Sequence, residues 1–525
     1  MINLTIPRLA LAVLFCLTHP ALRAADFDIV IYGGTSAGVV AAVQAAAMGK
    51  SVAVLEPGKH LGGLTAGGLG FTDIGNKAAI GGLSHAFYQR LGRHYGKPEV
   101  WTFEPGVAER TFNAMLEDAR VPVHFGERLT TVRKEGARIT EITTQKGGIY
   151  RAKMFIDATY EGDLMAKAGI AYFVGREANS VYGETLDGIR GATPQHQFIV
   201  PVDPYLKPGD PASGLLPLVQ PAAFGVPGAG DQAVQAYNLR LCLTKNPANR
   251  RPIDPPANYD PARYELLGRY FDALAAAHKR VTLKSFLKID LVTADKTDVN
   301  NNGAISTDDI GVNYDYPDAD EAGRERIFQE HLDYTKGLLT YLATSPRVPP
   351  NVRAAMQPWG LCRDEFSDTG GWPHQLYVRE ARRMLGGYVM TEKNCRHVEI
   401  VSDSIGLAAY NMDSHNCRRL VRDGHVANEG DVQVPPMRPY PISYRAIAPK
   451  RTECENLLVP VCLSASHIAY GSIRMEPVFM ILGQSAATAA ALAMNDHLAV
   501  QDVPYAKLRE RLLKDGQILE PTPKP

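Results

Sequence analysis

The segment from Phe27 to Gly75 constrains the fold more than any other part of this 525-residue chain. It opens with a short, mostly apolar run, Asp28 to Tyr32, which is typical of a buried strand in a parallel sheet. A glycine turn follows at once, then a helix of small residues (VVAAVQAAAMG), then a second apolar strand that ends at Glu56. Strand, tight turn, helix and strand in this order predict a β-α-β unit.

The turn of this unit has the composition of a dinucleotide-binding turn. Its backbone N–H groups and the helix N-terminus behind it are predicted to hold a pyrophosphate, and its residues are Gly33, Gly34, Thr35, Ser36, Ala37 and Gly38. Glu56 follows at about the spacing, roughly 20 residues, at which an acidic side chain accepts ribose hydroxyls. Thr35 replaces the middle glycine of the G-x-G-x-x-G pattern, so its side chain has to turn away from the phosphates. A β-α-β unit without a phosphate ligand is the alternative.

The loop after Glu56 favours FAD over NAD. It runs through HLGGLTAGGLGFTD, where a nicotinamide-binding unit usually continues with a short crossover. With its GGTSAG turn, its LGG loop and the segments DATYEGDL and SIRMEP, the sequence resembles a family of bacterial FAD-dependent oxidoreductases in the glutathione-reductase-like superfamily. The resemblance covers nearly the whole chain after residue 24. It implies a Rossmann-like α/β FAD-binding domain, FAD as cofactor, and cofactor contacts from Gly62, Gly63, Leu64 and Thr65.

Two later segments complete the expected cofactor site. Met154 to Gly175 has the pattern of a strand, a turn of small and acidic residues, and a helix. The resemblance places this turn beside the adenosine half of FAD, with contacts from Ala158, Thr159, Tyr160, Glu161, Gly162 and Asp163. An ordinary strand-to-helix connection is the alternative.

The last of these segments lies near the C-terminus. A predicted buried strand, Asn456 to Leu463, precedes a long alanine-rich helix that begins near Pro477. The resemblance directs this helix N-terminus at the pyrimidine edge of the flavin, which is expected to be lined by Ser472, Ile473, Arg474 and Met475. A helix of small residues that serves only packing is the alternative, and both roles are compatible.

The predicted FAD-binding domain is discontinuous. Residues 25–175 and 401–500 are assigned to it, with a C-terminal tail over residues 501–525. Residues 176–400 are richer in Pro, Asp and Tyr and are predicted to form an inserted α+β substrate domain, with helices near residues 260–278, 320–344 and 375–388. The formal net charge of zero gives no electrostatic reason to expect a nucleic-acid partner.

Residues 1–24 have the pattern of a secretory signal peptide, with Arg8, an apolar core from Leu9 to Leu17, and a small residue at the expected cleavage site after Ala24. The expectation is a periplasmic or secreted protein without stable membrane insertion; an N-terminal membrane anchor is the alternative. Six cysteines follow this segment, and none forms a C-x-x-C pair. This spacing argues against a dithiol relay, a zinc ribbon or an iron–sulfur cluster.

Oxidation of an alcohol or amine by a flavin needs a base near flavin N5. His415, in YNMDSHNCRR, and His467, in SASHIAYGSIRMEP, are the candidate catalytic residues, and His374 is a weaker third. A structural role is the alternative for each. Tyr444 and Arg445 are candidates for holding a polar or anionic substrate, and Arg445 fits a buried ion pair equally well.

The stretch from Asp298 to Asp309 matches the template of an EF-hand calcium loop, with Gly303 at its sharp turn. Only two of its four side-chain ligands are charged, and no clear helix precedes it. The resemblance also argues against calcium, because relatives carry a similar stretch within the substrate domain. We therefore predict no metal site and expect a polar loop in which Asn300 and Asn301 contact substrate hydroxyls.

These patterns predict an exported FAD-dependent oxidoreductase, a dehydrogenase or an oxidase. Its substrate is expected to be a small polar molecule, with a carbohydrate-derived compound as one candidate, that transfers a hydride to flavin N5. The sequence leaves the electron acceptor unknown. Two alternatives stay open: a binding or assembly protein that keeps the flavoprotein fold and uses a calcium loop, and a flavin-dependent elimination or hydrolysis without net redox change.

Overall fold

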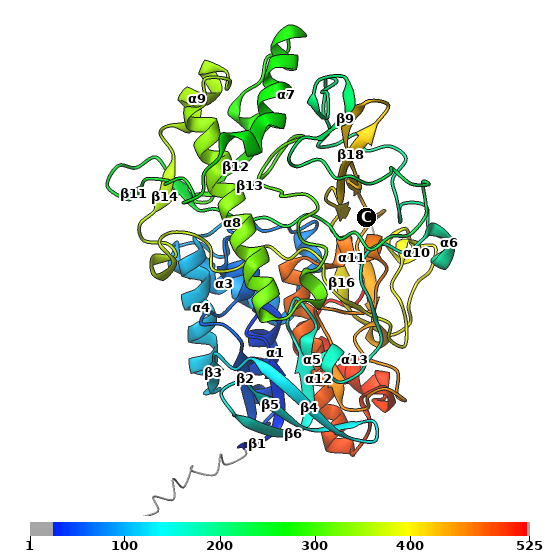
Figure 1. The fold of residues 1–525 in the computed structure, drawn as a ribbon. Coiled ribbons are helices and arrows are strands. Elements are labelled where there is room, and N and C mark those ends of the chain that lie inside the picture. The colour runs from blue at the N-terminus through cyan, green and yellow to red at the C-terminus, as the bar shows by residue number, and fades with distance from the viewer. Residues whose placement is uncertain (1–24, 522–525) are drawn as a thin grey trace, which may run out of the picture.

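The computed structural model describes residues 25–521, so the predicted signal peptide at residues 1–24 lies outside the described residues. A seven-stranded sheet forms the base of the molecule in Figure 1, in the order β3-β2-β1-β6-β5-β4, with β22 paired to β6. Its parallel strands are β1 (Ala25–Tyr32), β2 (Val52–Glu56), β3 (Val123–Phe125), β6 (Ile149–Asp157) and β22 (Leu457–Leu458). The antiparallel strands β4 (Leu129–Glu135) and β5 (Arg138–Thr144) extend it at one edge.

Apolar packing on both faces explains why the central strands are hydrophobic throughout. Successive side chains of a strand point to opposite faces, and those of β1 alternate between two apolar clusters. Ile29 and Ile31 belong to the main core, whereas Val30 and Tyr32 belong to a smaller cluster beneath β4 and β5. The sequence prediction of a buried parallel strand at this position is confirmed.

Helices α1 (Ser36–Ala47) and α12 (Glu476–Asp496) pack tightly against each other beside the sheet. Small residues allow this close approach, since a Cβ atom on Gly483 would lie 2.3 Å from the carbonyl oxygen of Ala37. Among the described residues, α12 alone is long and apolar enough to cross a membrane, and 89% of its apolar window is buried inside the protein. The C-terminal chain therefore returns to the domain of the seven-stranded sheet, as the sequence predicts. The predicted strand of this region is reduced to β22.

Further helices of this part are α2 (Gly63–Ala66), α3 (Gly82–His94), α4 (Pro105–Asp118) and α5 (Asp163–Lys167), and α11 (His467–Ile473) packs on β17. The predicted C-terminal tail contains helix α13 (Tyr505–Lys514), which packs on α12.

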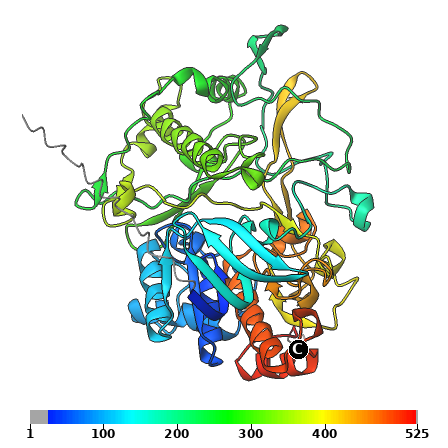
Figure 2. The same cartoon turned by 60° about the horizontal axis from the view of Figure 1, so that its bottom comes forward.

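The chain between β6 and the late strands builds a second part above the sheet, drawn in green and yellow in Figures 1 and 2. It contains helices α7 (Glu265–Ala276), α8 (Glu321–Thr344) and α9 (Pro350–Met356). Two small sheets accompany them: the hairpin of β12 (Leu287–Leu291) and β13 (Thr297–Asn301), and a sheet of β10 (Leu243–Thr244), β14 (Gly360–Cys362) and β11 (Arg250–Arg251). The α+β insertion is thus present, while its boundaries at residues 175, 400 and 500 stay predictions.

Nested antiparallel pairs follow in the chain: β16 (Ser404–Ala408) with β21 (Tyr440–Ser443), β17 (Met412–Ser414) with β20 (Val432–Val434), and the hairpin of β18 (Arg418–Arg422) with β19 (His425–Glu429). Strand β16 packs on α12.

The helix predicted near residues 375–388 is wrong. The segment is extended, and its strand β15 (Arg383–Met384) pairs with β7 (Tyr172–Phe173). Its charged side chains are buried against other parts of the chain: Arg379 pairs with Asp308, and Arg383 pairs with Glu177. An amphipathic helix would have exposed one polar face, so these tertiary ion pairs override the helical pattern of the sequence.

Candidate active site

The glycine turn after β1 has a geometry that only glycine allows at two positions. Gly33 has a φ of 102°, and a Cβ atom there would lie 2.9 Å from the carbonyl carbon of Ala158. A Cβ atom on Gly38 would lie 2.0 Å from the carbonyl oxygen of Gly33. Thr35 caps α1 and turns inward, because its hydroxyl donates to Ala158 O at 2.7 Å and accepts from Gly38 N–H at 3.3 Å. The turn therefore presents backbone rather than a side chain at this point.

Glu56 closes over this turn from the end of β2. Its carboxylate accepts hydrogen bonds from the N–H groups of Gly34 at 2.7 Å and Gly58 at 2.6 Å. Burial raises the pKa of Glu56 to about 7 despite these two bonds. The acid thus lies within reach of the turn, in a place where a hydroxyl donor would stabilise its charged form.

The turn and Glu56 open into one cavity of about 680 Å³. Four groups of residues line it: Gly33 and Thr35 of the glycine turn; Thr159, Tyr160, Glu161 and Asp163 of the turn after β6; Arg128, Leu129, Thr130 and Gln145 at the ends of β4 and β5; and residues of the insertion that include Tyr316, Arg324, His374, Gln375, Leu376 and Arg382. Residues predicted to contact the adenosine and residues predicted to contact the pyrophosphate therefore line the same cavity. A dinucleotide fits this combination of glycine cradle, buried acid and helix N-terminus.

The turn after β6 is fixed by the insertion. Asp163 pairs with Arg324 of α8 at 2.6 Å and with Arg382 at 2.8 Å, and the hydroxyl of Tyr316 donates to Glu161 at 3.0 Å. Burial raises the pKa of Asp163, but the two guanidinium groups outweigh burial and hold it below its usual value. Sequence reasoning identified the turn and missed these insertion residues, since nothing local to them signals the contact.

The LGG loop, the turn after β6 and α12 meet at Glu476. The hydroxyl of Tyr160 donates to Glu476 Oε1 at 2.8 Å and accepts from Leu64 N–H at 2.8 Å. Thr65 donates to Glu476 Oε2 at 2.6 Å. Sequence reasoning missed Glu476, although an acidic residue in the first turn of a helix is a favourable and visible signal. Gly62 and Gly63 have φ values of 93° and 53° and let the chain turn at this point.

The sequence matches the family model described as "FAD dependent oxidoreductase" over residues 28–512. The chain belongs to this family. The glycine turn, the cavity and Glu56 fit the cofactor of this family, FAD. No curated protein sequence matches the chain.

Solved structures that resemble a part of this chain include two dehydrogenases and a reductase. A 3-ketosteroid-Δ4-(5α)-dehydrogenase from Rhodococcus jostii RHA1 shares 18% identity, with a TM-score of 0.21, over 29% of this chain and 50% of its own. An L-proline dehydrogenase from P. horikoshii shares 17% identity, with a TM-score of 0.25, over 30% of this chain and 59% of its own. A T. acidophilum thioredoxin reductase shares 23% identity, with a TM-score of 0.18, over 30% and 40%. This chain therefore spans less than two thirds of the length of each.

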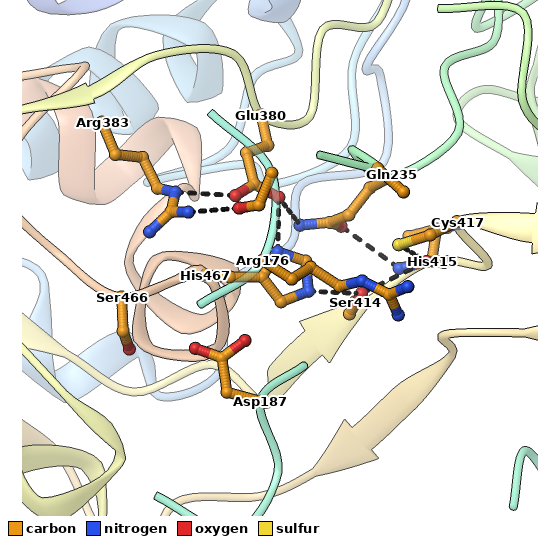
Figure 3. Close-up of polar contacts among 12 residues, drawn as sticks. Arg176, Asp187, Gln235, Glu380, Arg383, Ser414, His415, Cys417, Ser466 and His467 are labelled. Carbon is orange, nitrogen blue, oxygen red and sulfur yellow. Dashed lines mark hydrogen bonds and ion pairs between the residues drawn. The ribbon is translucent and has the colours of Figure 1, made fainter. Parts of the chain in front are cut away.

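His467, the first catalytic candidate, is buried and has both ring nitrogens engaged (Figure 3). Its Nδ1 lies 2.7 Å from Glu380 Oε2, and its Nε2 lies 3.0 Å from Ser414 Oγ. Glu380 also accepts from Gln235 at 2.9 Å. A histidine held on both sides has no free lone pair for a substrate, so these contacts support a structural role.

His415, the second candidate, keeps one nitrogen free of a hydrogen bond. Its Nδ1 lies 2.9 Å from Asp308 Oδ2, whereas its Nε2 lies 3.6 Å from Asp413 Oδ2, beyond a good hydrogen bond. Asp413 pairs with Arg474 at 2.9 Å. Burial and Arg379 lower the pKa of His415, but Asp308 and Asp413 outweigh them and hold it above its usual value. His415 is thus joined through Asp413 to the predicted flavin edge.

Arg379 and Asn300 of the insertion complete the cluster around His415. Arg379 pairs with Asp308 at 2.9 Å and lies over the ring of Tyr377. Asn300 of β13 accepts from Asn238 at 3.0 Å and from Arg379 at 3.4 Å. The sequence predicts Asn300 as a substrate contact but gives no signal for Arg379 or for the role of Asp308, because only the tertiary fold brings them to His415.

The EF-hand template does not adopt a ligand loop. Asp298 pairs with Arg240, and Asp309 pairs with Arg263 at 3.2 Å. Residues 297–301 form strand β13 rather than a loop. Within residues 25–521, no group of three or more His, Cys, Asp or Glu side chains is arranged to hold a metal ion.

The remaining predicted residues have these surroundings. The hydroxyl of Tyr444 donates to Val500 O at 2.6 Å, and Arg445, half-exposed, pairs with Asp403 at 3.0 Å. Neither contacts the His415 cluster among the described residues, so the structure lends their substrate role no support. Asn301 and Ser472 are buried polar residues, whereas Ile473 and Met475 belong to the main apolar core.

His374, the third candidate base, lines the cavity rather than the cluster. Its ring stacks on His60 with centroids 3.8 Å apart. Burial, aided by His60, lowers its pKa to about 4.

Proposed function

We propose that this family member oxidises a small polar substrate by hydride transfer to FAD, with His415 as the base. The observation that carries this proposal is the buried chain from His415 through Asp413 to Arg474, at the junction of α11 and α12. Bound FAD would supply the two-electron acceptor at N5. The chain itself would supply the base, the positioning of the substrate and a site that excludes water.

In this mechanism His415 Nε2 takes the proton of the substrate hydroxyl or amine. Asp308 accepts from Nδ1–H, which keeps the lone pair on Nε2 and stabilises the imidazolium that forms. Arg379 holds Asp308 in place. Asn300 would donate its NH₂ group to a second substrate oxygen, since its side-chain oxygen already accepts from Asn238 and Arg379.

A polyhydroxylated substrate, such as a carbohydrate-derived compound, suits these groups. Asn300 and Asp413, both partly buried, and the buried guanidinium of Arg379 offer donors and acceptors for substrate hydroxyls. An anaerobic panel of sugars, polyols, hydroxy acids and amines tests this directly. We expect at least one polyhydroxylated compound to bleach the absorbance of the bound flavin without NAD(P)H. Failure of all classes to reduce fully loaded enzyme would contradict the proposal.

Export to the periplasm or medium is part of the proposal, and it is supported by the signal-like sequence of residues 1–24. Cell fractionation of a C-terminally tagged protein, with N-terminal sequencing of the product, tests it. We expect a product that begins near Ala25 outside the cytoplasm. An uncleaved cytoplasmic or membrane-bound chain would contradict it.

The pH dependence of flavin reduction should report on His415. The base form has to be deprotonated, so the rate is expected to rise with pH through a pKa above the ordinary 6.5. Asp308→Asn removes a negative charge and its charge-assisted hydrogen bond. Asp413 alone then opposes burial and Arg379, so the pKa of His415 should fall. The rise of the rate with pH should therefore move to lower pH, and the maximal rate should fall.

Asp309→Asn is the matched control for Asp308→Asn. Asp309 pairs with Arg263 instead of His415, and burial raises its pKa to about 7. Asp309→Asn should leave the pH range over which the rate of flavin reduction rises unchanged. Stopped-flow measurement of flavin reduction across pH tests both variants. If the rise of the rate with pH did not shift in Asp308→Asn, Asp308 would not position His415.

A further inference from the structure

Two cysteines of the insertion face each other in the small sheet of β10, β14 and β11. The Sγ atoms of Cys242 and Cys362 lie 3.6 Å apart, and both side chains are fully buried. With Phe366 they form an apolar cluster of their own, separate from the main core. These cysteines are 120 positions apart in the sequence, so the fold alone brings them together.

Their backbone geometry matches that of a cross-strand disulfide. β10 and β14 are antiparallel with Leu243 opposite Leu361, and Cys242 and Cys362 continue this register. Cys362 N–H donates to Cys242 O at 3.3 Å, which marks a hydrogen-bonded pair. Such pairs have Cα atoms about 5.5 Å apart, near the commonest separation in disulfides. A small side-chain rotation would bring the sulfurs from 3.6 Å to bonding distance, about 2.05 Å.

The other four described cysteines have different surroundings. Cys462 lies 3.2 Å from Tyr160 O, Cys417 lies 3.5 Å from His415 O, and Cys454 lies 3.6 Å from Asn456 Oδ1. Cys395 is buried near Tyr440. Among residues 25–521, no second pair of sulfurs approaches within contact distance.

We propose that Cys242 and Cys362 form a disulfide that closes the base of the insertion. The oxidant is a small-molecule or protein disulfide. One cysteine thiolate attacks it, forms a mixed disulfide and releases one thiol; the second cysteine thiolate then attacks the protein sulfur and releases the other. Two protein thiols are oxidised and one disulfide is reduced to two thiols, with both thiol protons transferred to solvent or to the released thiolates.

The bond forms while the chain folds. In the folded protein the neighbouring thiol and burial raise the pKa of Cys242 well above its usual range, so little reactive thiolate is present. The buried pair is also closed to an oxidant. Once formed, the bond is protected from reductants by the same burial.

The disulfide would stabilise a weakly paired region. β10 and β11 have two residues each and β14 has three, so few ladder hydrogen bonds hold this sheet. The loop that the bond closes contains Asn300, Asp308 and Arg324, which contact the predicted substrate and cofactor sites. Long closed loops gain most from such a cross-link in the chain-entropy model.

Refolding of the denatured full chain in a buffer of oxidised and reduced glutathione tests the proposal. We expect peptide mapping without reduction to find Cys242 linked to Cys362, and two fewer titratable thiols than in reduced protein. The oxidised protein should also unfold at a higher urea concentration than the reduced protein. This test does not depend on export or on the substrate.

Single alanine variants make the assignment specific. Cys242→Ala and Cys362→Ala should each raise the number of titratable thiols by one relative to oxidised wild type and remove the gain in urea resistance. Cys454→Ala, the control, should lower that number by one and keep the linked peptides. The proposal would be overturned if Cys242 and Cys362 were unlinked in correctly refolded wild type, or if other cysteines were linked. Peptide mapping of the wild type measures the link by mass and not by stability, so it decides the question even if a variant folds poorly.

Discussion

Replacing His415 with glutamine is expected to lower the rate constant of flavin reduction by about 10²–10⁴-fold, the usual contribution of a general base. Glutamine keeps a polar group of similar size opposite Asp308 but cannot take a proton. FAD should stay bound, because His415 lies in the cluster above α11 and does not line the 680 Å³ cavity. The variant should therefore retain the yellow colour of bound FAD, and its flavin should be reduced slowly.

His467→Gln is the matched comparison, since it changes the same residue type within the same polar network (Figure 3). His467 bridges Glu380 and Ser414, both fully buried, and glutamine leaves at least one of them without a partner. An unsatisfied buried polar group costs about 1–3 kcal/mol of folding free energy. We expect a lower Tm with a much smaller loss of rate.

Stopped-flow reduction and thermal unfolding of both loaded variants separate the two roles. The roles would be reversed if His467→Gln lost the rate while His415→Gln lost only stability. A wild-type reduction rate in His415→Gln, measured with a reducing substrate of the wild type, would remove His415 from the mechanism.

The parts of the fold that local pattern specifies were predictable. The strand, turn and helix from Asp28 to Ala47 and the helix that begins at Glu476 follow from apolar runs, glycines and small residues. In each case the pattern lies within one element, and the tertiary packing favours the same conformation as the pattern. The segment at residues 375–388 shows the opposite case, because buried partners for Arg379 and Arg383 decide its extended conformation.

The candidate site was only partly predictable for the same reason. His415 and its neighbour Asp413 can be noticed in the sequence, but the partner that fixes the tautomer, Asp308, is far away in the chain. Asp308 falls within the stretch from Asp298 to Asp309, whose local pattern matches a calcium loop, whereas residues 297–301 form strand β13. Arg379 completes the cluster from a third segment. A cluster assembled from three distant segments has no local signature.

Gly38→Ala is expected to weaken FAD binding by roughly 5–150-fold, which corresponds to about 1–3 kcal/mol of steric strain in the bound state. The new Cβ atom would lie 2.0 Å from the carbonyl oxygen of Gly33, a backbone atom that cannot rotate away. In the FAD-free protein the turn can relax by moving, because the cavity leaves space on one side. It would have to return to the strained geometry when its N–H groups bind the pyrophosphate.

Gly49→Ala, just beyond the other end of α1, separates this effect from general backbone strain. Gly49 has a φ of 74°, and nothing lies within 4 Å of a Cβ atom built there. Alanine should cost about 1–2 kcal/mol of stability through its left-handed conformation and leave FAD affinity unchanged. Titration of the FAD-free proteins with FAD, followed by flavin fluorescence, measures both. If folded Gly38→Ala bound FAD as tightly as wild type, the pyrophosphate could not lie against this turn, and the place of Glu56 at the ribose would have to be abandoned with it.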